Sequence, residues 1–165
     1  PVVGPMSTDA APYVAGPASV RAAQVRDALR DPAIAAIVAT RGGYGSAQLL
    51  PHLDIALIRQ TRTLLVGYSD ITSLLDVWTG HAGVVSIHGP MAEGRLARGA
   101  DAYDRDGFLR VVTEPRPFGD VSTAGATVLA TGEATGVLRG GTLTQLAALA
   151  GTPWAFHADE PSILF

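Results

Sequence analysis

The first ninety residues alternate short apolar runs with segments whose apolar residues recur at helical spacing. Continuous apolar runs at 33–40, 63–66 and 84–87 predict strands, and we expect the first to be buried on both faces. Ser19 and Ser46 are expected to cap two of the helices between them. The predicted helices are 19–30, 46–53, 55–59 and 71–79. Strands that alternate with helices favour an α/β fold with a parallel, doubly wound sheet.

The pattern becomes less regular after residue 92. Residues 92–122 are charged and rich in glycine and proline, which indicates a connector with a short helix near 108–112. The elements expected beyond it are paired strands at 126–131 and 135–138, a helix between Gly141 and Gly151 and a strand at 162–165.

These patterns divide the chain into three parts. Residues 1–113 are expected to form an α/β domain, residues 114–125 a linker, and residues 126–165 the beginning of a second domain. Residues 6–16 are predicted to be a loop. The segments at the two ends resemble interrupted strands, so we expect the chain to be part of a longer protein.

Composition narrows the possible functions. The chain has 165 residues, of which 47% are hydrophobic and 16% charged, as in globular domains. Its net charge is −3 without a basic cluster, which argues against a nucleic-acid partner. The absence of cysteine excludes thiolate catalysis and cysteine-based zinc sites. No apolar run approaches the roughly 20 residues that span a bilayer, so no membrane partner is expected.

Three polar or glycine-bearing turns follow the predicted strands. They comprise residues 41–45 (Arg-Gly-Gly-Tyr-Gly), 67–70 (Gly-Tyr-Ser-Asp) and 88–91 (His-Gly-Pro-Met). In parallel sheets, ligands bind beyond the carboxyl ends of the strands. The three turns are therefore expected to converge on one edge of the sheet and to form the functional site.

Ser69 lies at the predicted strand-to-helix turn, where α/β hydrolases present a nucleophilic hydroxyl. The alternative is a helix cap, since Ser or Asp before a helix commonly caps it. The G-x-S-x-G pattern is not met, because Ile71 occupies the position of the second glycine. On this turn alone, capping is the favoured interpretation.

The neighbouring residues supply candidates for the other groups of a serine hydrolase. Gly42 or Gly43 could bring a backbone N–H to a reacting carbonyl, although a simple tight turn explains them equally well. Asp70 is assigned a capping role and a backbone N–H for an oxyanion hole. His88 is the best local candidate for a base, yet a structural role is commoner for such a histidine. No cofactor or metal site is indicated.

Taken in order, the three turns resemble the LD-carboxypeptidase family of serine peptidases. Further matches are residues 13–16 followed by Arg21, residues 50–54, and Gly140-Gly141 with residues 151–153. The resemblance covers nearly the whole chain. It implies a flavodoxin-like N-terminal domain, here without its first strand and helix, and the start of a β-rich C-terminal domain.

The resemblance also implies a chemistry. The family cleaves amide bonds between L and D centres with a Ser-Glu-His triad and no metal, usually in cytoplasmic muropeptide tetrapeptides that lose D-alanine during cell-wall recycling. A related branch, the microcin immunity peptidases, hydrolyses a peptide–nucleotide antibiotic. Carried over, Ser69 is the nucleophile, and the N–H of Asp70 with that of Gly42 or Gly43 forms the oxyanion hole. A homodimer is expected for the intact protein.

The chain departs from the family in what it omits. The triad Glu and His would both follow residue 165, and His88 does not match the triad His. None of the glutamates at 93, 114, 133 and 160 matches the triad Glu. A nucleophile without its base is expected to be inactive, so a non-catalytic, truncated peptide-binding module is the alternative to a peptidase fragment.

Overall fold

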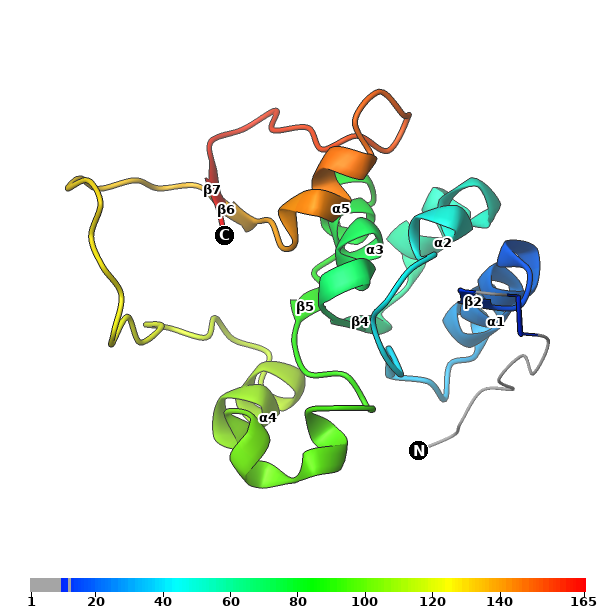
Figure 1. Cartoon of the computed structure of the whole chain (residues 1–165), viewed down its shortest axis with the longest axis horizontal. Helices are drawn as coiled ribbons and strands as arrows, with labels where there is room; N and C mark the ends of the chain where they lie inside the picture. The colour runs from blue at the N-terminus through cyan, green and yellow to red at the C-terminus, as the bar shows by residue number, and fades with distance from the viewer. Residues whose placement is uncertain (1–9, 12) are drawn as a thin grey trace.

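The computed structural model describes residues 10–11 and 13–165. Its main sheet has three strands, β3 (Ala36–Val38), β4 (Leu64–Gly67) and β5 (Ile87–His88), in the order β3-β4-β5. Both neighbouring pairs run parallel. The prediction of an α/β fold with a parallel sheet is therefore confirmed (Figure 1).

The helices occupy the predicted places. They are α1 (Ala18–Arg30), the 3-10 helix η1 (Ala47–His52), α2 (Ile55–Gln60), the 3-10 turn η2 (Ser69–Ile71), α3 (Thr72–Asp76) and the π-helical turn η3 (Val77–His81).

The predicted serine caps are wrong. The residue before α1 is Pro17, and neither it nor Ser46 caps with its side chain. Pro17 fits there because the first N–H groups of a helix have no intrahelical partner to lose. The side chain of Asp54, by contrast, accepts hydrogen bonds from the first turn of α2.

Strand β3 is shorter and more exposed than the continuous apolar run predicts. It covers three residues, of which Ala36 and Val38 are exposed. Within the described residues, β3 pairs only with β4. An edge strand has one neighbour fewer to cover it, so the expectation of burial on both faces is wrong for β3 and holds better for β4.

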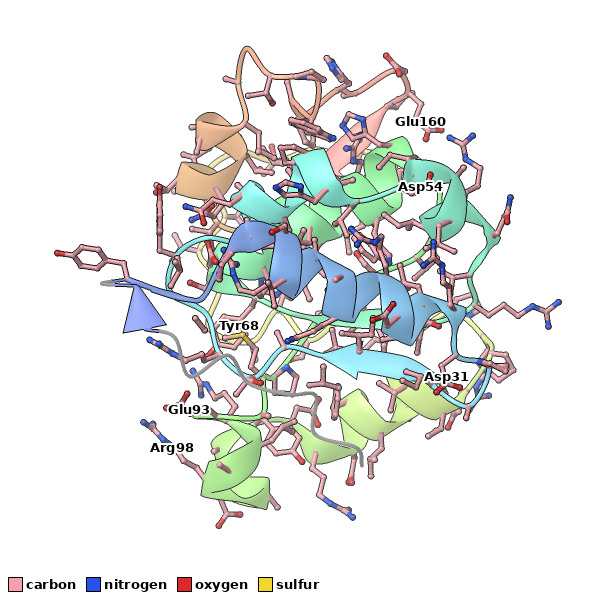
Figure 2. The ribbon with its side chains drawn as sticks, turned by 90° about the vertical axis from the view of Figure 1, so that its right-hand side faces the viewer. Asp31, Asp54, Tyr68, Glu93, Arg98 and Glu160 are labelled. Atoms are coloured by element: carbon pink, nitrogen blue, oxygen red, sulfur yellow. The ribbon has the colours of Figure 1, made fainter. Side chains whose placement is uncertain are left out.

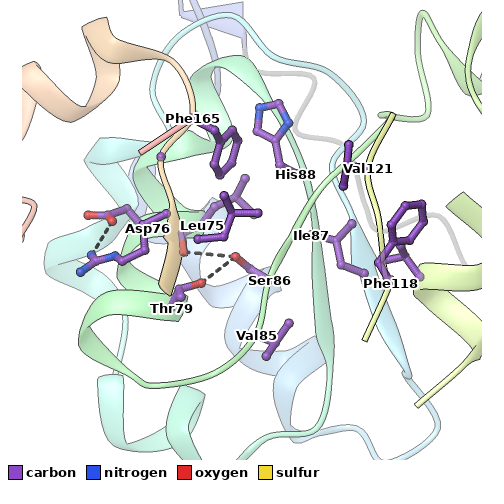
Figure 3. A pocket seen from close by; sticks show the side chains of 14 residues that line it. Leu75, Asp76, Thr79, Val85, Ser86, Ile87, His88, Phe118, Val121 and Phe165 are labelled. Atoms are coloured by element: carbon purple, nitrogen blue, oxygen red, sulfur yellow. Dashed lines mark hydrogen bonds and ion pairs between the residues drawn. The ribbon is translucent and has the colours of Figure 1, made fainter. Parts of the chain in front are cut away.

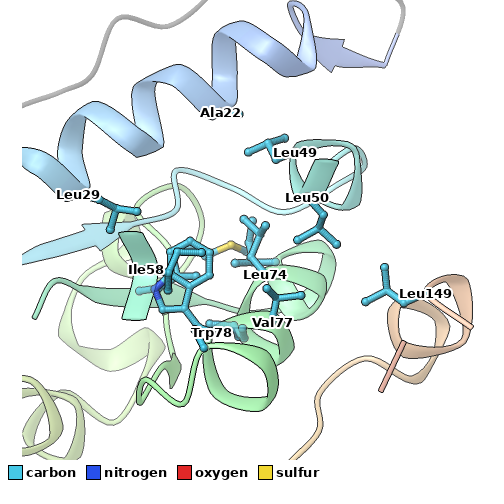
Figure 4. Close-up of a cluster of buried hydrophobic side chains, with 14 residues drawn as sticks. Ala22, Leu29, Leu49, Leu50, Ile58, Leu74, Val77, Trp78 and Leu149 are labelled. Atoms are coloured by element: carbon cyan, nitrogen blue, oxygen red, sulfur yellow. The ribbon is translucent and has the colours of Figure 1, made fainter. Parts of the chain in front are cut away.

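The hydrophobic core surrounds α3 and the turn that follows it. Trp78, Val77 and Leu74 pack there with Leu50 and Ile58 (Figure 4). The expected amphipathic helix at 71–79 is instead buried all round. Thr72 and Ser73 are wholly buried and Asp76 nearly so, although these polar residues lie between the apolar positions.

The remaining elements differ more from expectation. They are β1 (Ala10–Ala11) and β2 (Val14–Ala15), the 3-10 turns η4 (Leu96–Arg98) and η5 (Ala100–Ala102), α4 (Arg105–Thr113), β6 (Val137–Arg139), α5 (Leu143–Ala148) and β7 (Ser162–Leu164). The short antiparallel pair β1–β2 replaces part of the loop predicted at 6–16. The interrupted strand expected at residues 2–5 lies outside the described residues.

The predicted pairing of strands 126–131 and 135–138 is wrong. Residues 126–131 form no strand and are exposed, whereas β6 pairs in parallel with β7 at the end of the chain. Residues 126–131 include apolar side chains but have no partner strand and no core beneath them. Their sequence pattern alone is therefore not enough to form a strand. The three-part domain division stays a prediction.

An ion pair explains why Asp76 can be buried. Arg139, at the end of β6, donates to Asp76 Oδ1 over 2.7 Å, and the two side chains are 9% and 1% exposed. The Arg139 guanidinium also lies 4.4 Å from the centre of the Phe156 ring and donates to the carbonyl of His157. The pair thus fastens the C-terminal segment to the helix that follows Ser69.

Removing the arginine should therefore destabilise the fold strongly. We expect Arg139→Met to lower the free energy of unfolding by about 3 kcal/mol, because it leaves the Asp76 carboxylate buried without a counter-charge. Urea denaturation measures the loss. Arg116→Met is the matched control, since its pair with Glu114 is largely exposed and should cost under about 1 kcal/mol. Equal losses for the two variants would contradict this account.

Candidate active site

The three turns meet at the carboxyl edge of the sheet, as the sequence predicts. The backbone N–H groups of Ala92 and Glu93 donate to the carbonyls of Ala39 and Thr40, so the segment after β5 lies along the end of β3. A Cβ added to Gly42 would lie 3.2 Å from the Cβ of Ser69. Polar and glycine residues from three separate loops are thus brought together at one place.

Ser69 has the backbone geometry of an exposed turn nucleophile. Its φ is +60°, and it is the one non-glycine residue with a positive φ in the part of the chain that the structure describes. Such a conformation is strained for an L-residue and marks functional sites when the surroundings enforce it. Gly67 permits the tight turn, because a Cβ there would lie 2.8 Å from Ile71 Cγ2.

The capping interpretation of this turn is wrong. Neither η2 nor α3 has a side-chain cap hydrogen bond. The Asp70 carboxylate, which we expected to cap, instead accepts from the backbone N–H of Ser46 over 2.9 Å. Its direction follows from the tight turn, which aims the carboxylate across to the loop of residues 41–46 rather than along its own helix.

A buried cluster of three side chains locks the turn to that loop. The Ser46 hydroxyl donates to the Asp70 carbonyl and lies 2.7 Å from the Ser73 hydroxyl. Ser73 also donates to the Asp70 carbonyl, over 2.9 Å. Sequence reasoning missed this cluster, although Ser73 stands one helical turn after Asp70 and Ser46 directly follows the glycine loop. Buried and mutually bonded polar groups of this kind fix a single backbone arrangement.

Arg21 holds the same loop from the other side. Its guanidinium donates to the carbonyls of Gly16 and Gly45 and to the Gln48 side chain. Burial lowers the pKa of Arg21, and the nearby Asp70 carboxylate partly offsets that effect. The N–H groups of the Arg21 guanidinium thus hold the loop of residues 41–46 in place.

The two glycine candidates differ in position. A Cβ on Gly42 would lie 3.4 Å from the Ser69 hydroxyl and from Met91 Cε, so Gly42 lies directly against the serine. Around Gly43, whose φ is +124°, the atoms within 4 Å of such a Cβ belong to Arg41. Close approach of backbone therefore explains a glycine at 42, and a left-handed conformation explains one at 43.

The ring of His88, the candidate base, contacts two aromatic side chains. Its ring packs 5.2 Å from Phe165 and 6.1 Å from Tyr68, measured between ring centres. No hydrogen bond joins His88 to Ser69 among the residues that the structure describes. Partial burial lowers the pKa of His88, against a smaller opposing effect of a backbone hydrogen bond, and so favours the neutral ring.

The His88 ring borders a cavity of about 390 Å³. The cavity lies between β5, α3 and the C-terminal segment, and its walls are mostly apolar (Figure 3). Leu75, Ile87, Phe118, Leu138 and Phe165 contribute to them. No group of three or more His, Asp or Glu side chains within the described residues gathers to hold a metal.

The strain at Ser69 has a measurable consequence. We expect Ser69→Gly to be more stable than Ser69→Ala by about 1 kcal/mol, because glycine adopts a positive φ without steric cost. Urea denaturation of both variants checks the order. At the exposed Ser19, in the first turn of α1, the order should reverse, since glycine is a poorer helix former than alanine. The same order at both positions would show that the turn is unstrained.

Comparisons with known proteins agree on one family. Residues 1–89 match the model of the LD-carboxypeptidase N-terminal domain. A Streptomyces coelicolor protein named "putative carboxypeptidase" is 39% identical, over 94% of this chain and 51% of its own length. The murein tetrapeptide carboxypeptidase of Pseudomonas aeruginosa is 35% identical, over 92% of this chain and 51% of its own.

A solved structure shares the fold. That of MccF in complex with glutamyl sulfamoyl guanosine superposes with a TM-score of 0.78 over 98% of this chain and 56% of its own, at 21% identity. The chain thus spans about half the length of the relatives it matches. None of the described helices is long and apolar enough to cross a bilayer.

Proposed function

This chain belongs to the LD-carboxypeptidase family, and we propose that it carries the nucleophile of a serine carboxypeptidase that releases D-alanine from muropeptide tetrapeptides. Ser69 would attack the carbonyl of the amide bond between the L and D centres. The P. aeruginosa relative is named for a murein tetrapeptide substrate, which supports this choice. We further propose a cytoplasmic location and a homodimer for the intact protein.

The observation that carries the proposal is the positive φ of Ser69 at the end of β4, with Gly42 against its hydroxyl. In this arrangement the hydroxyl stands out from the turn, and backbone N–H groups can approach the substrate carbonyl. The N–H of Asp70 is one proposed oxyanion donor. For the other, the close approach of Gly42 to Ser69 favours Gly42 over Gly43.

The base that this chemistry needs would come from outside the 165 residues. His88 packs against Phe165 and Tyr68, and Glu93 pairs with Arg41, so neither activates the serine. We propose that a Glu and a His of the protein's C-terminal half complete the triad. The flavodoxin-like arrangement of the N-terminal domain and a β-rich second domain belong to the same proposal.

The first test measures D-alanine release by a protein of the relatives' full length. We expect Ser69→Ala to lower kcat by about four orders of magnitude, because the attacking hydroxyl is lost while the backbone donors stay. Ser19→Ala, an exposed change in α1, should leave the rate unaltered. If Ser69→Ala released D-alanine at the rate of the unchanged protein, the proposed nucleophile would be wrong.

A non-catalytic peptide-binding module is the second candidate, favoured because no side chain of the described residues forms a hydrogen bond with Ser69 as a base would. The flanking DNA separates the two. An in-frame continuation that encodes Leu-Glu-Asp and, further on, a His supports the peptidase, whereas a stop codon directly after Phe165 supports the module.

The microcin-immunity branch is a third candidate because the fold matches that of MccF. Hydrolysis of a peptide–nucleotide conjugate, compared with that of a muropeptide, distinguishes the branches.

A further inference from the structure

Beside the turn nucleophile lies a cation whose partner is weakly held. The Nε of Arg41 lies 3.6 Å from a carboxylate oxygen of Glu93, and the two side chains are 70% and 65% exposed. Exposed ion pairs of this kind contribute little to stability, so a competing carboxylate can replace Glu93 at low cost. In Figure 2, Glu93 lies near the surface on the side of the molecule where Tyr68 is seen.

The backbone fixes the position of Arg41 relative to Ser69. Arg41 directly precedes Gly42, where an added Cβ would lie 3.4 Å from the Ser69 hydroxyl, and its Nη2 lies 3.5 Å from the position a Cβ would take on Gly43. The guanidinium thus folds over the same loop that supports the hydroxyl. Arg21, the other arginine at this loop, donates to Gly16, Gly45 and Gln48, and its role there is structural.

A carboxypeptidase must recognise a free terminal carboxylate close to its nucleophile, and a nearby cation is well suited to bind that group. In a substrate that ends in a single residue after the scissile bond, the terminal carboxylate carbon lies about 4 Å from the reacting carbonyl carbon. Arginine suits such a group, because its planar fork binds both carboxylate oxygens at once. Its flexible side chain on the residue next to Gly42 can cover that distance.

We propose that Arg41 binds the free terminal carboxylate of the substrate and that Glu93 occupies it when the site is empty. This inference rests on the proposed function, for which it names the feature that selects carboxy-terminal substrates. Arg41 is a specificity-determining residue here, and Glu93 is a competitor that the substrate displaces.

Binding to the 165-residue chain tests the proposal without catalysis. The probes are acetyl-L-lysyl-D-alanine and its carboxy-terminal amide, and their Kd values are measured by NMR titration. We expect the acid to bind about tenfold more tightly than the amide, and Arg41→Gln to bring the two affinities together. Glu93→Gln should lower the Kd of the acid by about twofold to fivefold, because the competing carboxylate is removed. Arg98→Gln, an exposed change of equal charge, should keep the preference for the acid.

Three outcomes would overturn the inference: equal binding of acid and amide, no detectable binding of either, or a preference for the acid that survives Arg41→Gln. Failure of the proposed function has a different signature. Ser69→Ala should leave the acid-to-amide ratio in binding unchanged while it abolishes D-alanine release. If D-alanine release depends on Ser69 but the acid-to-amide affinity ratio does not depend on Arg41, the proposed peptidase function is supported and the proposed carboxylate site is wrong.

Discussion

The hydrogen-bonded cluster of Ser46, Asp70 and Ser73 is the constraint on which the site depends. All three are buried, and Ser46, in the loop after β3, bonds to both Asp70 and Ser73, which lie after β4. The cluster holds the turn after β4 against the glycine loop after β3, and that contact places Gly42 beside Ser69. A strained serine backbone persists only where its surroundings enforce it, and this cluster with Gly67 provides the enforcement.

The second constraint is the complete burial of the helix behind the nucleophile. Its apolar side packs into the core, and its polar side is covered by the C-terminal segment. Thr72 accepts from the backbone N–H of Thr142, Ser73 contacts Gln145, and Asp76 pairs with Arg139. The three partners lie 63 to 72 residues later in the chain. The segment after residue 136 thus helps to support the helix that begins at the serine turn.

The sequence predicted the elements that local pattern determines. Runs such as 63–66 and the spacing of Leu74 and Trp78 identify a buried strand and a helix wherever they occur, and the three turns after the strands converged as expected. The sequence-based prediction failed where a contact with a distant segment determines the structure. The parallel pairing of β6 with β7 and the direction of the Asp70 carboxylate both depend on contacts with segments more than 20 residues away. The roles of Ser69, Asp70 and Gly42 remain proposals.

The central claim is that the strained turn presents Ser69 as a reactive nucleophile. Labelling the full-length protein with a fluorophosphonate and locating the adduct by peptide mass spectrometry tests it most directly. The account predicts one adduct, on the hydroxyl of Ser69, that excess muropeptide suppresses. An adduct on a different serine would contradict it, as would no adduct at a reagent concentration that fully modifies a known serine peptidase.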